Sequence, residues 1–350
     1  MPKMRTALLF VALALPVGLL AQDQPLTTAP ADDQAAQQAD SLNLFASRAL
    51  TDAGHNAREG DLKLTDRNLS DRDDSPGGPV LYPADLSKFS ATGAVLQTAT
   101  LHNVYINALP SAWGDPVRFL HDLNHSELIH ITDQYVGVEF NDRYPLGTSF
   151  LAAVTPAAAF PPSPSNPTPP KNIITINQVV GLVHAAASLA GSGLGNVYNI
   201  FIPPGDDTCF SGNTSCFSPD NPNTFAFCAF HASVRFKDIG VVLFTVEPET
   251  GVPGCASQQP SPNGIVADSV DDTLGHELFE TITDPQGRSW FVLGSLDLGG
   301  AEIGDVCQPS GNSAAQFLVP TYRVNGHPYA IQLEYSNAGH GCFSRPFDDQ

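Results

Sequence analysis

The chain has 350 residues, of which 36 are Asp or Glu and 16 are Lys or Arg, so its formal net charge at pH 7 is −20. A protein this acidic repels phosphate backbones and anionic lipid surfaces, which argues against a nucleic-acid partner. No stretch after the N-terminus approaches the ~20 consecutive apolar residues that a membrane-spanning helix needs, so no membrane span is expected.

The N-terminus has the pattern of a secretory signal peptide. Lys3 and Arg5 precede an apolar run from Ala7 to Leu20, and the small residue Ala21 ends it. Removal of residues 1–21 would take the net charge to −22, because both basic residues leave with the segment. The pattern predicts a secreted or periplasmic protein.

Residues 22–77 are rich in Asp, Gln, Ala, Ser and Gly and show no sustained apolar period. Such a composition buries too little apolar surface to offset the entropy of ordering. The segment is therefore expected to be a disordered leader or a pro-segment. A second low-complexity stretch, the Pro-rich insert at residues 155–171, is expected to be an exposed loop.

Residues 78–346 are predicted to form a single domain in which strands and helices alternate. A strand is expected over Ala99–Leu109, and Asp115 followed by Pro116 predicts a helix start. Asn177 is expected to cap a helix that ends before Gly191. Three further apolar runs are expected to be buried strands: Val197–Ile202, Phe225–Val234 and Ile239–Val246.

The end of the domain is expected to be β-structure. Asn325 and Gly326 lie between two strand-like runs, and this dipeptide favours the positive φ values of a type I′ hairpin turn. The expected fold class is α/β, with α+β as the alternative: one domain with a mixed sheet, helices and a C-terminal hairpin, expected to be monomeric.

Six cysteines lie in the C-terminal half of this exported chain, which predicts up to three structural disulfides. They are Cys209, Cys216, Cys228, Cys255, Cys307 and Cys342. Six cysteines allow 15 pairings, of which Cys307 with Cys342 and Cys228 with Cys255 are preferred here.

The segment Ala267–Ile282 carries the most chemistry. Its apolar residues recur every four positions, which predicts an amphipathic helix. His276 and Glu280, one turn apart, can reach one cation, and Glu277 beside them can act as a general base on a bound water. The pattern is that of the HExxH metallopeptidase helix with Glu280 in place of the second histidine. The alternative is a solvated helix face.

A catalytic zinc usually takes three protein ligands. The downstream segment that contains Glu302 and Asp305 offers a third ligand in Glu302 and a supporting carboxylate in Asp305. Zn²⁺ is the expected cation, with Ca²⁺ or Mn²⁺ open, because one histidine and two carboxylates also suit harder cations.

Two more residues are candidates for this site. His231 could polarise a substrate carbonyl or stabilise an oxyanion; the alternative is a partly buried histidine that hydrogen-bonds to the backbone. Asp284, four residues beyond Glu280, could orient a ligand or cap the end of the helix.

The residues GHELFETITDP (275–285), Trp290 and AEIGDVC (301–307) resemble the signature of the phosphate-induced protein or EXORDIUM-like family. IFIPPG (200–205) and FCAFHAS (227–233) are similar to further motifs of that family. The resemblance implies a secreted protein with a metallopeptidase-like fold, linked in plants to the cell wall and growth signalling. Carried over by position, it implies a site at His276, Glu277, Glu280, Glu302 and Asp305. The Pro-rich insert and Asp284 depart from the plant pattern.

The sequence thus predicts an exported zinc-dependent hydrolase, a peptidase acting on extracellular peptides or proteins. The alternative is an inactive protein on a metallopeptidase-like scaffold that binds a protein or a cell-wall polymer.

Overall fold

The protein is described from a computed structural model. It covers residues 24–26, 39–48, 85–157, 172–209, 216–221, 223–257, 261–292, 302–307 and 321–347. The predicted signal peptide lies outside these residues, as does the Pro-rich insert from residue 158 to 171. No helix within the described stretches is long and apolar enough to cross a membrane.

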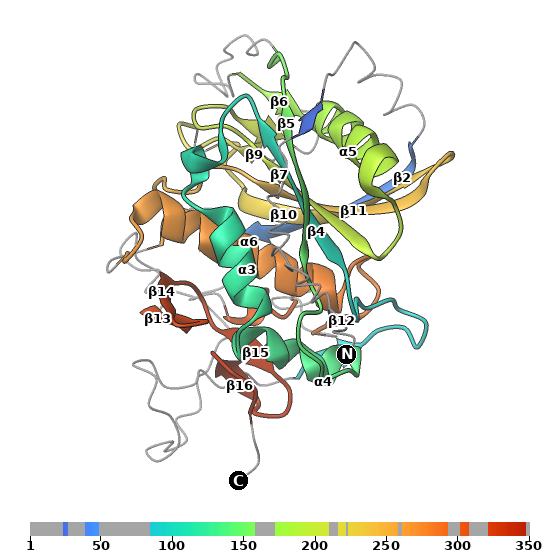
Figure 1. Ribbon diagram of the computed structural model, residues 1–350, viewed down its shortest axis with the longest axis vertical. Helices are drawn as coiled ribbons and strands as arrows, with labels where there is room; N and C mark the ends of the chain where they lie inside the picture. Colours follow the sequence, from blue (N-terminus) through green and yellow to red (C-terminus); the bar gives the residue numbers. More distant parts are fainter. Residues whose placement is uncertain are drawn as a thin grey trace, which may run out of the picture.

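A mixed seven-stranded sheet forms the centre of the fold (Figure 1). Its strand order is β1-β5-β4-β7-β11-β10-β2. The strands are β1 (Gln24–Leu26), β5 (Leu146–Ala152), β4 (Thr100–Ile106), β7 (Asn196–Phe201), β11 (Gly240–Glu247), β10 (Phe227–Phe236) and β2 (Ala39–Arg48). The first five are parallel, whereas β10 runs antiparallel to both β11 and β2. The predicted α/β class with a mixed sheet is confirmed at this level.

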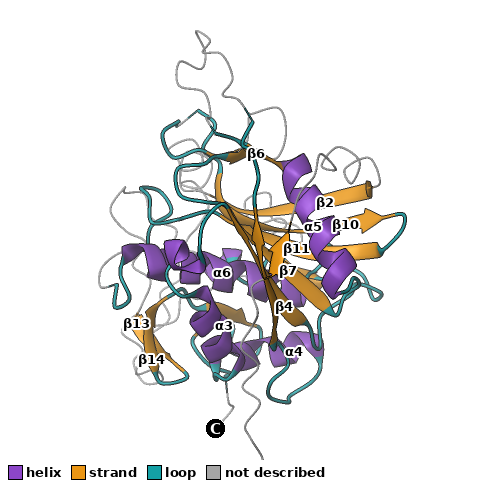
Figure 2. Ribbon diagram, turned by 45° about the horizontal axis from the view of Figure 1, so that its top comes forward, coloured by secondary structure: helices purple, strands orange, loops and turns teal. Residues whose placement is uncertain are grey.

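Helices cover both faces of the sheet (Figure 2). Helix α5 (Ile176–Ala190) lies on one face, while α3 (Pro116–Asn124), α4 (Asp133–Val136) and α6 (Ile265–Thr283) lie on the other. The 3₁₀ turns are η1 (Pro110–Trp113), η2 (Leu128–Thr132) and η3 (Asp305–Cys307). The short strands are β3 (Ser87–Lys88), β6 (Ile174–Thr175), β8 (Thr208–Cys209), β9 (Cys216–Phe217), β12 (Trp290–Phe291), β13 (Thr321–Val324), β14 (His327–Ala330), β15 (Glu334–Ser336) and β16 (Gly341–Phe343).

Most local predictions hold, for the expected physical reasons. The Asp115 side chain accepts a hydrogen bond from the Arg118 N–H at the start of α3, and Asn325 and Gly326 take positive φ values in the β13–β14 turn. The predicted cap of α5 was wrong: Thr175, not Asn177, caps it, because Thr175 and Gln178 form a reciprocal capping box that satisfies two backbone donors.

The leader differs from its expected lack of structure in two places. Gln24–Leu26 adds strand β1 to one edge of the sheet, and Ala39–Arg48 adds β2 to the other edge beside β10. Backbone hydrogen bonding to a sheet edge can order a segment whose composition is poor in apolar residues. The leader therefore supplies both edges of the central sheet.

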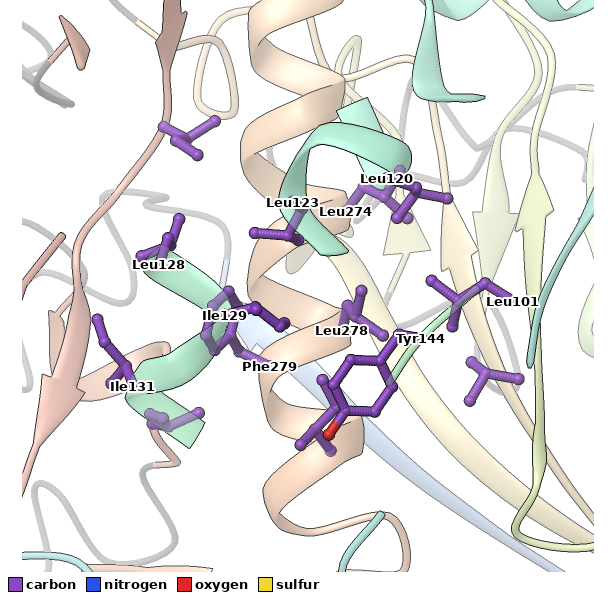
Figure 3. Close-up of a cluster of buried hydrophobic side chains, with 14 of the residues drawn as sticks. Leu101, Leu120, Leu123, Leu128, Ile129, Ile131, Tyr144, Leu274, Leu278 and Phe279 are labelled. Carbon is purple, nitrogen blue, oxygen red and sulfur yellow. The ribbon is translucent and has the colours of Figure 1, made fainter. Parts of the chain in front are cut away.

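Helix α6 is a buried central element rather than a surface helix. Its residues Val270, Leu274, Leu278 and Ile282, the predicted apolar row, all lie in the core cluster beneath the sheet. Figure 3 shows Leu274 and Leu278 packed near Leu120 and Leu123 of α3. This packing fixes the position of the polar side chains on the same helix.

Three disulfides join the six cysteines: Cys209–Cys216, Cys228–Cys255 and Cys307–Cys342. The two preferred pairings are therefore confirmed. Cys307 closes the segment that carries Glu302 and Asp305, so the third disulfide ties that segment to β16.

Candidate metal centre

The candidate site lies between strand β10 and helix α6. Along β10, Phe230 and Ala232 point into the apolar cluster under α5, so alternation places His231 on the α6 face. His231 and Glu277 are both 0 % exposed, and His276 and Glu280 are at most 2 % exposed. The alternative of a solvated helix face for these residues is thus excluded by the structure.

His231 meets the two glutamates of α6 directly. Its Nδ1 lies 3.3 Å from Glu277 Oε2 and 3.3 Å from Glu280 Oε2. Its Nε2 lies 3.7 Å from Glu302 Oε2. The structure therefore surrounds His231 with three carboxylates, and the residue is fully buried rather than partly buried against the backbone.

His276 approaches the other oxygen of Glu280. Its Nε2 is 3.0 Å from Glu280 Oε1 and 3.9 Å from Asp305 Oδ1. Its Nδ1 lies 3.2 Å from Gln332 Oε1, and the amide nitrogen of Gln332 donates to the Gly304 carbonyl. Gln332 thus fixes the orientation of the His276 ring through Nδ1, the nitrogen that does not face Glu280, as outer partners commonly do for ligand histidines.

The segment at 302–307 is fitted closely against this histidine. A Cβ on Gly304 would come within 2.5 Å of His276 Nδ1, so only glycine permits this approach. The Asp305 N–H donates to Glu280 Oε1 at 3.2 Å, and Tyr335 N–H donates to the Ile303 carbonyl. Together with the disulfide at Cys307, these bonds position Glu302 and Asp305.

Asp284 lies at the C-terminal end of α6, and its Oδ2 is buried without a hydrogen bond to the described residues. Its Oδ1 accepts hydrogen bonds from the backbone N–H groups of Arg288 and Ser289, at 2.6 and 2.8 Å. Of the two roles considered for Asp284, the structure gives it that of stabilising the turn after the helix.

Mutual interaction shifts the pKa values of these groups in opposite directions. Burial raises the pKa of Asp305 to about 7 and raises that of Glu302 and Glu277. Burial also disfavours an ionised Glu280, but the two nearby histidines outweigh it and lower the pKa of Glu280 to about 2. Glu280 is therefore the carboxylate most firmly held in its ionised form.

The histidines respond to the same charges. Burial alone lowers the pKa of His231, but Glu302, Glu277 and Glu280 outweigh burial and raise it well above the usual value. The pKa of His276 is raised for the same reason, mainly by Glu280. Both rings therefore lie in a strongly negative surrounding.

The donor set fits a cation. Two groups offer ligand atoms that lie within 4.8 Å of one another: His231 with Glu280 and Glu302, and His276 with Glu280 and Asp305. Glu277 Oε1 and Glu302 Oε1 are buried and make no hydrogen bond to the described residues. Because buried carboxylate oxygens are costly unless paired or bound to a metal, Glu302 Oε1 is suited to ligate a cation and Glu277 Oε1 is suited to contact a water held by that cation.

The grouping differs from the set expected from spacing. His276, Glu280 and Glu302 were the expected ligands, but the structure groups Glu302 with His231 and groups His276 with Asp305. Spacing along one helix and one loop does not reveal that a strand crosses between them and inserts His231.

A polar row on the sheet was missed by the sequence analysis. Asn103, Asn199, Thr245 and His231 occupy one register row across β4, β7, β11 and β10. Asn199 donates to Asn103 Oδ1 at 2.9 Å, and Thr245 donates to Asn199 Oδ1 at 3.2 Å. Single polar residues inside otherwise apolar strand runs were the signal that could have revealed this row.

Two more buried carboxylates, Glu247 and Glu334, were also missed. Glu247 ends β11 and is 0 % exposed, and neither of its oxygens hydrogen-bonds to the described residues. Burial raises the pKa of both groups well above the usual value.

Comparison of the chain with family models, with curated proteins and with solved structures finds no match. The chemistry of the site is therefore argued from its own residues.

Proposed function

We propose that the protein is an exported, metal-dependent hydrolase that cleaves peptides, with Zn²⁺ as its resident cation. The observation that carries the proposal is the position of Glu280 between two histidines, with Glu277 beside it and an unpartnered oxygen on each of Glu277 and Glu302. Histidine nitrogen and carboxylate oxygen are the usual zinc donors, whereas Ca²⁺ takes oxygen ligands. Mn²⁺ suits the same set.

The resemblance to the EXORDIUM-like family rests on its short motifs alone, and we extend only its secreted, metallopeptidase-like character to this chain. Three disulfides support export, since such bonds persist in oxidising compartments. The acidic surface is compatible with neutral or cationic peptides.

A bound cation would polarise the scissile carbonyl and lower the pKa of an attacking water. Glu277 is suited to accept the proton of that water through Oε1, because its Oε2 faces His231 Nδ1. Burial raises the pKa of Glu277, which brings it closer to the range in which a general base is most effective. His231 then orients Glu277 and does not itself need to touch the carbonyl.

Peptide is the preferred substrate because β10 can pair with an extended chain. Within the described sheet, β10 is paired on one side by β11 and on the other by the leader strand β2. His231 is opposite Phe45 of β2 in the register. A peptide that took the place of β2 would therefore pair antiparallel with β10 beside His231, in the manner of strand addition.

The test is the variant Glu277→Gln, assayed on a peptide library after zinc loading. Loss of a general base should lower the rate by about 10²–10⁴-fold while the metal content stays unchanged. Glu249→Gln is the matched control, since Glu249 bonds to the Gly251 N–H away from the site. A Glu277→Gln variant that hydrolyses peptides at the wild-type rate would contradict the proposal.

The second candidate function is a binding protein with a structural cation, and the complete burial of the site favours it. His231 and Glu277 are inaccessible in the structure, and Glu302 is only 5 % exposed. Zinc bound tightly by a wild-type protein that cleaves no peptide, with or without its leader, would support this candidate and exclude catalysis.

A further inference from the structure

The two oxygens of Glu280 face different histidines. Oε2 lies 3.3 Å from His231 Nδ1, and Oε1 lies 3.0 Å from His276 Nε2. A carboxylate that bridges two cations gives one oxygen to each of them. The division at Glu280 is thus the geometry of a bridge.

Each histidine also has its own second carboxylate. Glu302 Oε2 lies 3.7 Å from His231 Nε2, the ring nitrogen that does not face Glu280, and Asp305 Oδ1 lies 3.9 Å from His276 Nε2. The two ligand groups share only Glu280. They come from separate elements, since His231 belongs to β10 and His276 to α6.

We infer that this site holds two divalent cations bridged by Glu280, one bound by His231 and Glu302 and the other by His276 and Asp305. The inference rests on the proposed function for the presence of a metal, and it deepens that proposal by fixing the number of ions and the ligands of each.

The charge of the surroundings supports two ions. Five buried carboxylates and the partly buried Asp305 gather around the histidines: Glu247, Glu277, Glu280, Glu302 and Glu334 are the buried five. Among the described residues, Arg143 is the only buried Lys or Arg, and it pairs with Asp133 outside the site. A carboxylate that ligates a cation avoids the cost of an unpaired buried charge, and two cations can ligate more of these groups than one.

The scaffold around each half is independent, which suits separate ligation. Gln332 and Gly304 hold His276 from the side opposite Glu280. His231 is held by β10, whose backbone pairs with β11 and β2. Removing one histidine should therefore disturb one ion and leave the other group of ligands in place.

The experiment counts metal in the full mature chain. Metal-free protein is loaded with Mn²⁺ or Zn²⁺, excess metal is removed, and bound ions are measured by elemental analysis for wild type, His231→Ala and His276→Ala. The expected result is two ions per chain in the wild type and one in each variant. The control is His327→Ala, because His327 is half-exposed and pairs with Asp122 away from the site; it should retain both ions.

Electron paramagnetic resonance of the Mn²⁺-loaded wild type gives a test that needs no variant. Two manganese ions that share a carboxylate lie roughly 4 Å apart, so they should give a coupled spectrum in place of the six lines of an isolated ion. One ion per chain with an isolated spectrum would overturn the inference, as would complete loss of metal in either histidine variant that remains folded by circular dichroism.

The outcomes separate this inference from the proposed function. Two coupled ions in a protein that cleaves no peptide would support the paired centre and reject the hydrolase. Peptide cleavage with a single isolated ion would reject the paired centre and leave the hydrolase standing. No bound metal at all would reject both.

Discussion

The two faces of the central sheet differ in chemistry although the same strands build both, because only the α6 face carries the polar row and the carboxylates of the site. Beneath α5 the face is apolar, with Phe230, Val246 and Ile200 packed against helix side chains. Beneath α6 the neighbouring positions are His231 and Thr245, and His231 contacts the Glu277 carboxylate of the site. One residue along a strand is enough to pass from one environment to the other.

The fold thus combines one face that stabilises it by apolar burial with a second face that carries closely spaced buried acids. The α5 face buries a large apolar cluster, and the burial of apolar surface contributes stability that does not depend on pH. The α6 face concentrates buried acids that cost free energy unless a cation or a proton compensates them. The stability contributed by the α5 face can thus offset the free-energy cost of the buried acids on the α6 face.

The largest expected effect comes from pH in the metal-free protein. Asp272 of α6 accepts a hydrogen bond from the Gln332 N–H. Burial raises the pKa of Asp272 and of Asp305 to about 7, from the ordinary value of 3.8. Between these values the folded state binds more protons than the unfolded state, so the free energy of unfolding falls as pH rises through this window. Two shifts of this size imply a loss on the order of several kcal/mol.

The other titrating groups of the site do not reverse this direction. The pKa values of His231 and His276 are raised, so their contribution is present below pH 6.5 and is lost as pH rises through their folded values. The stabilising contribution of Glu280 is present above its ordinary pKa of 4.5 and is lost only as pH falls through about 2. Metal-loaded protein should behave oppositely, since ligands bind cations when deprotonated.

Urea unfolding of metal-free and zinc-loaded protein, at about pH 4.5 and about pH 7.5, measures this difference. The metal-free protein should be the less stable of the two at the higher pH. If its stability instead increased between the two pH values, the buried carboxylates would not control the α6 face.

Local features of the fold could be predicted from the sequence because their causes are local. Asp115 and Asn325–Gly326 fix the start of α3 and a hairpin turn through their own backbone and side-chain geometry. The apolar row of α6 likewise follows from its four-residue spacing. These elements depend on few distant contacts.

The site could be predicted only in part, because its partners are far apart along the chain. His276, Glu277 and Glu280 were recognisable on one helix, but His231 lies 46 residues before Glu277, and Gln332 lies 56 residues after His276. No local pattern determines that β10 and the segment after β14 meet at α6. The polar row was hidden because strands buried on both faces look continuously apolar.

In the leader, the sequence contained a strand signal that the prediction of disorder did not use. Its composition suggested disorder, yet the run SLNL at residues 41–44 alternates polar and apolar residues, with Leu42 and Leu44 apolar, which is a strand signal. In the structure this run belongs to β2 and pairs with β10. Average composition concealed a short pattern that a sheet edge can use.

A matched pair of core truncations gives the next largest effect. Leu182 lies in the apolar cluster under α5, and Leu278 lies in the cluster beside the site. Leu182→Ala and Leu278→Ala should each lower the free energy of unfolding by about 2–5 kcal/mol, because each leaves a cavity. Only Leu278→Ala should also weaken zinc binding, by about tenfold, through loss of the support that orients α6.

Denaturant titration and competition with a chromogenic zinc chelator would measure both quantities for this pair. Equal weakening of zinc binding by the two variants would mean that the faces are mechanically coupled rather than separate.

The smallest expected effect tests the boundary between the faces at two adjacent residues of β11. Thr245 donates to Asn199 Oδ1 on the polar side, and Val246 packs into the apolar cluster on the other. Thr245→Val removes one hydrogen bond and should cost about 1 kcal/mol. Val246→Thr should lower the free energy of unfolding by more, about 1–3 kcal/mol, because its hydroxyl enters an apolar cluster.

Neither variant removes a metal ligand, so zinc content should stay constant while urea unfolding measures the two losses of stability. Equal costs would show that the α5 face accepts a polar group as readily as the α6 face does, and the contrast between the two faces would then be one of shape rather than polarity.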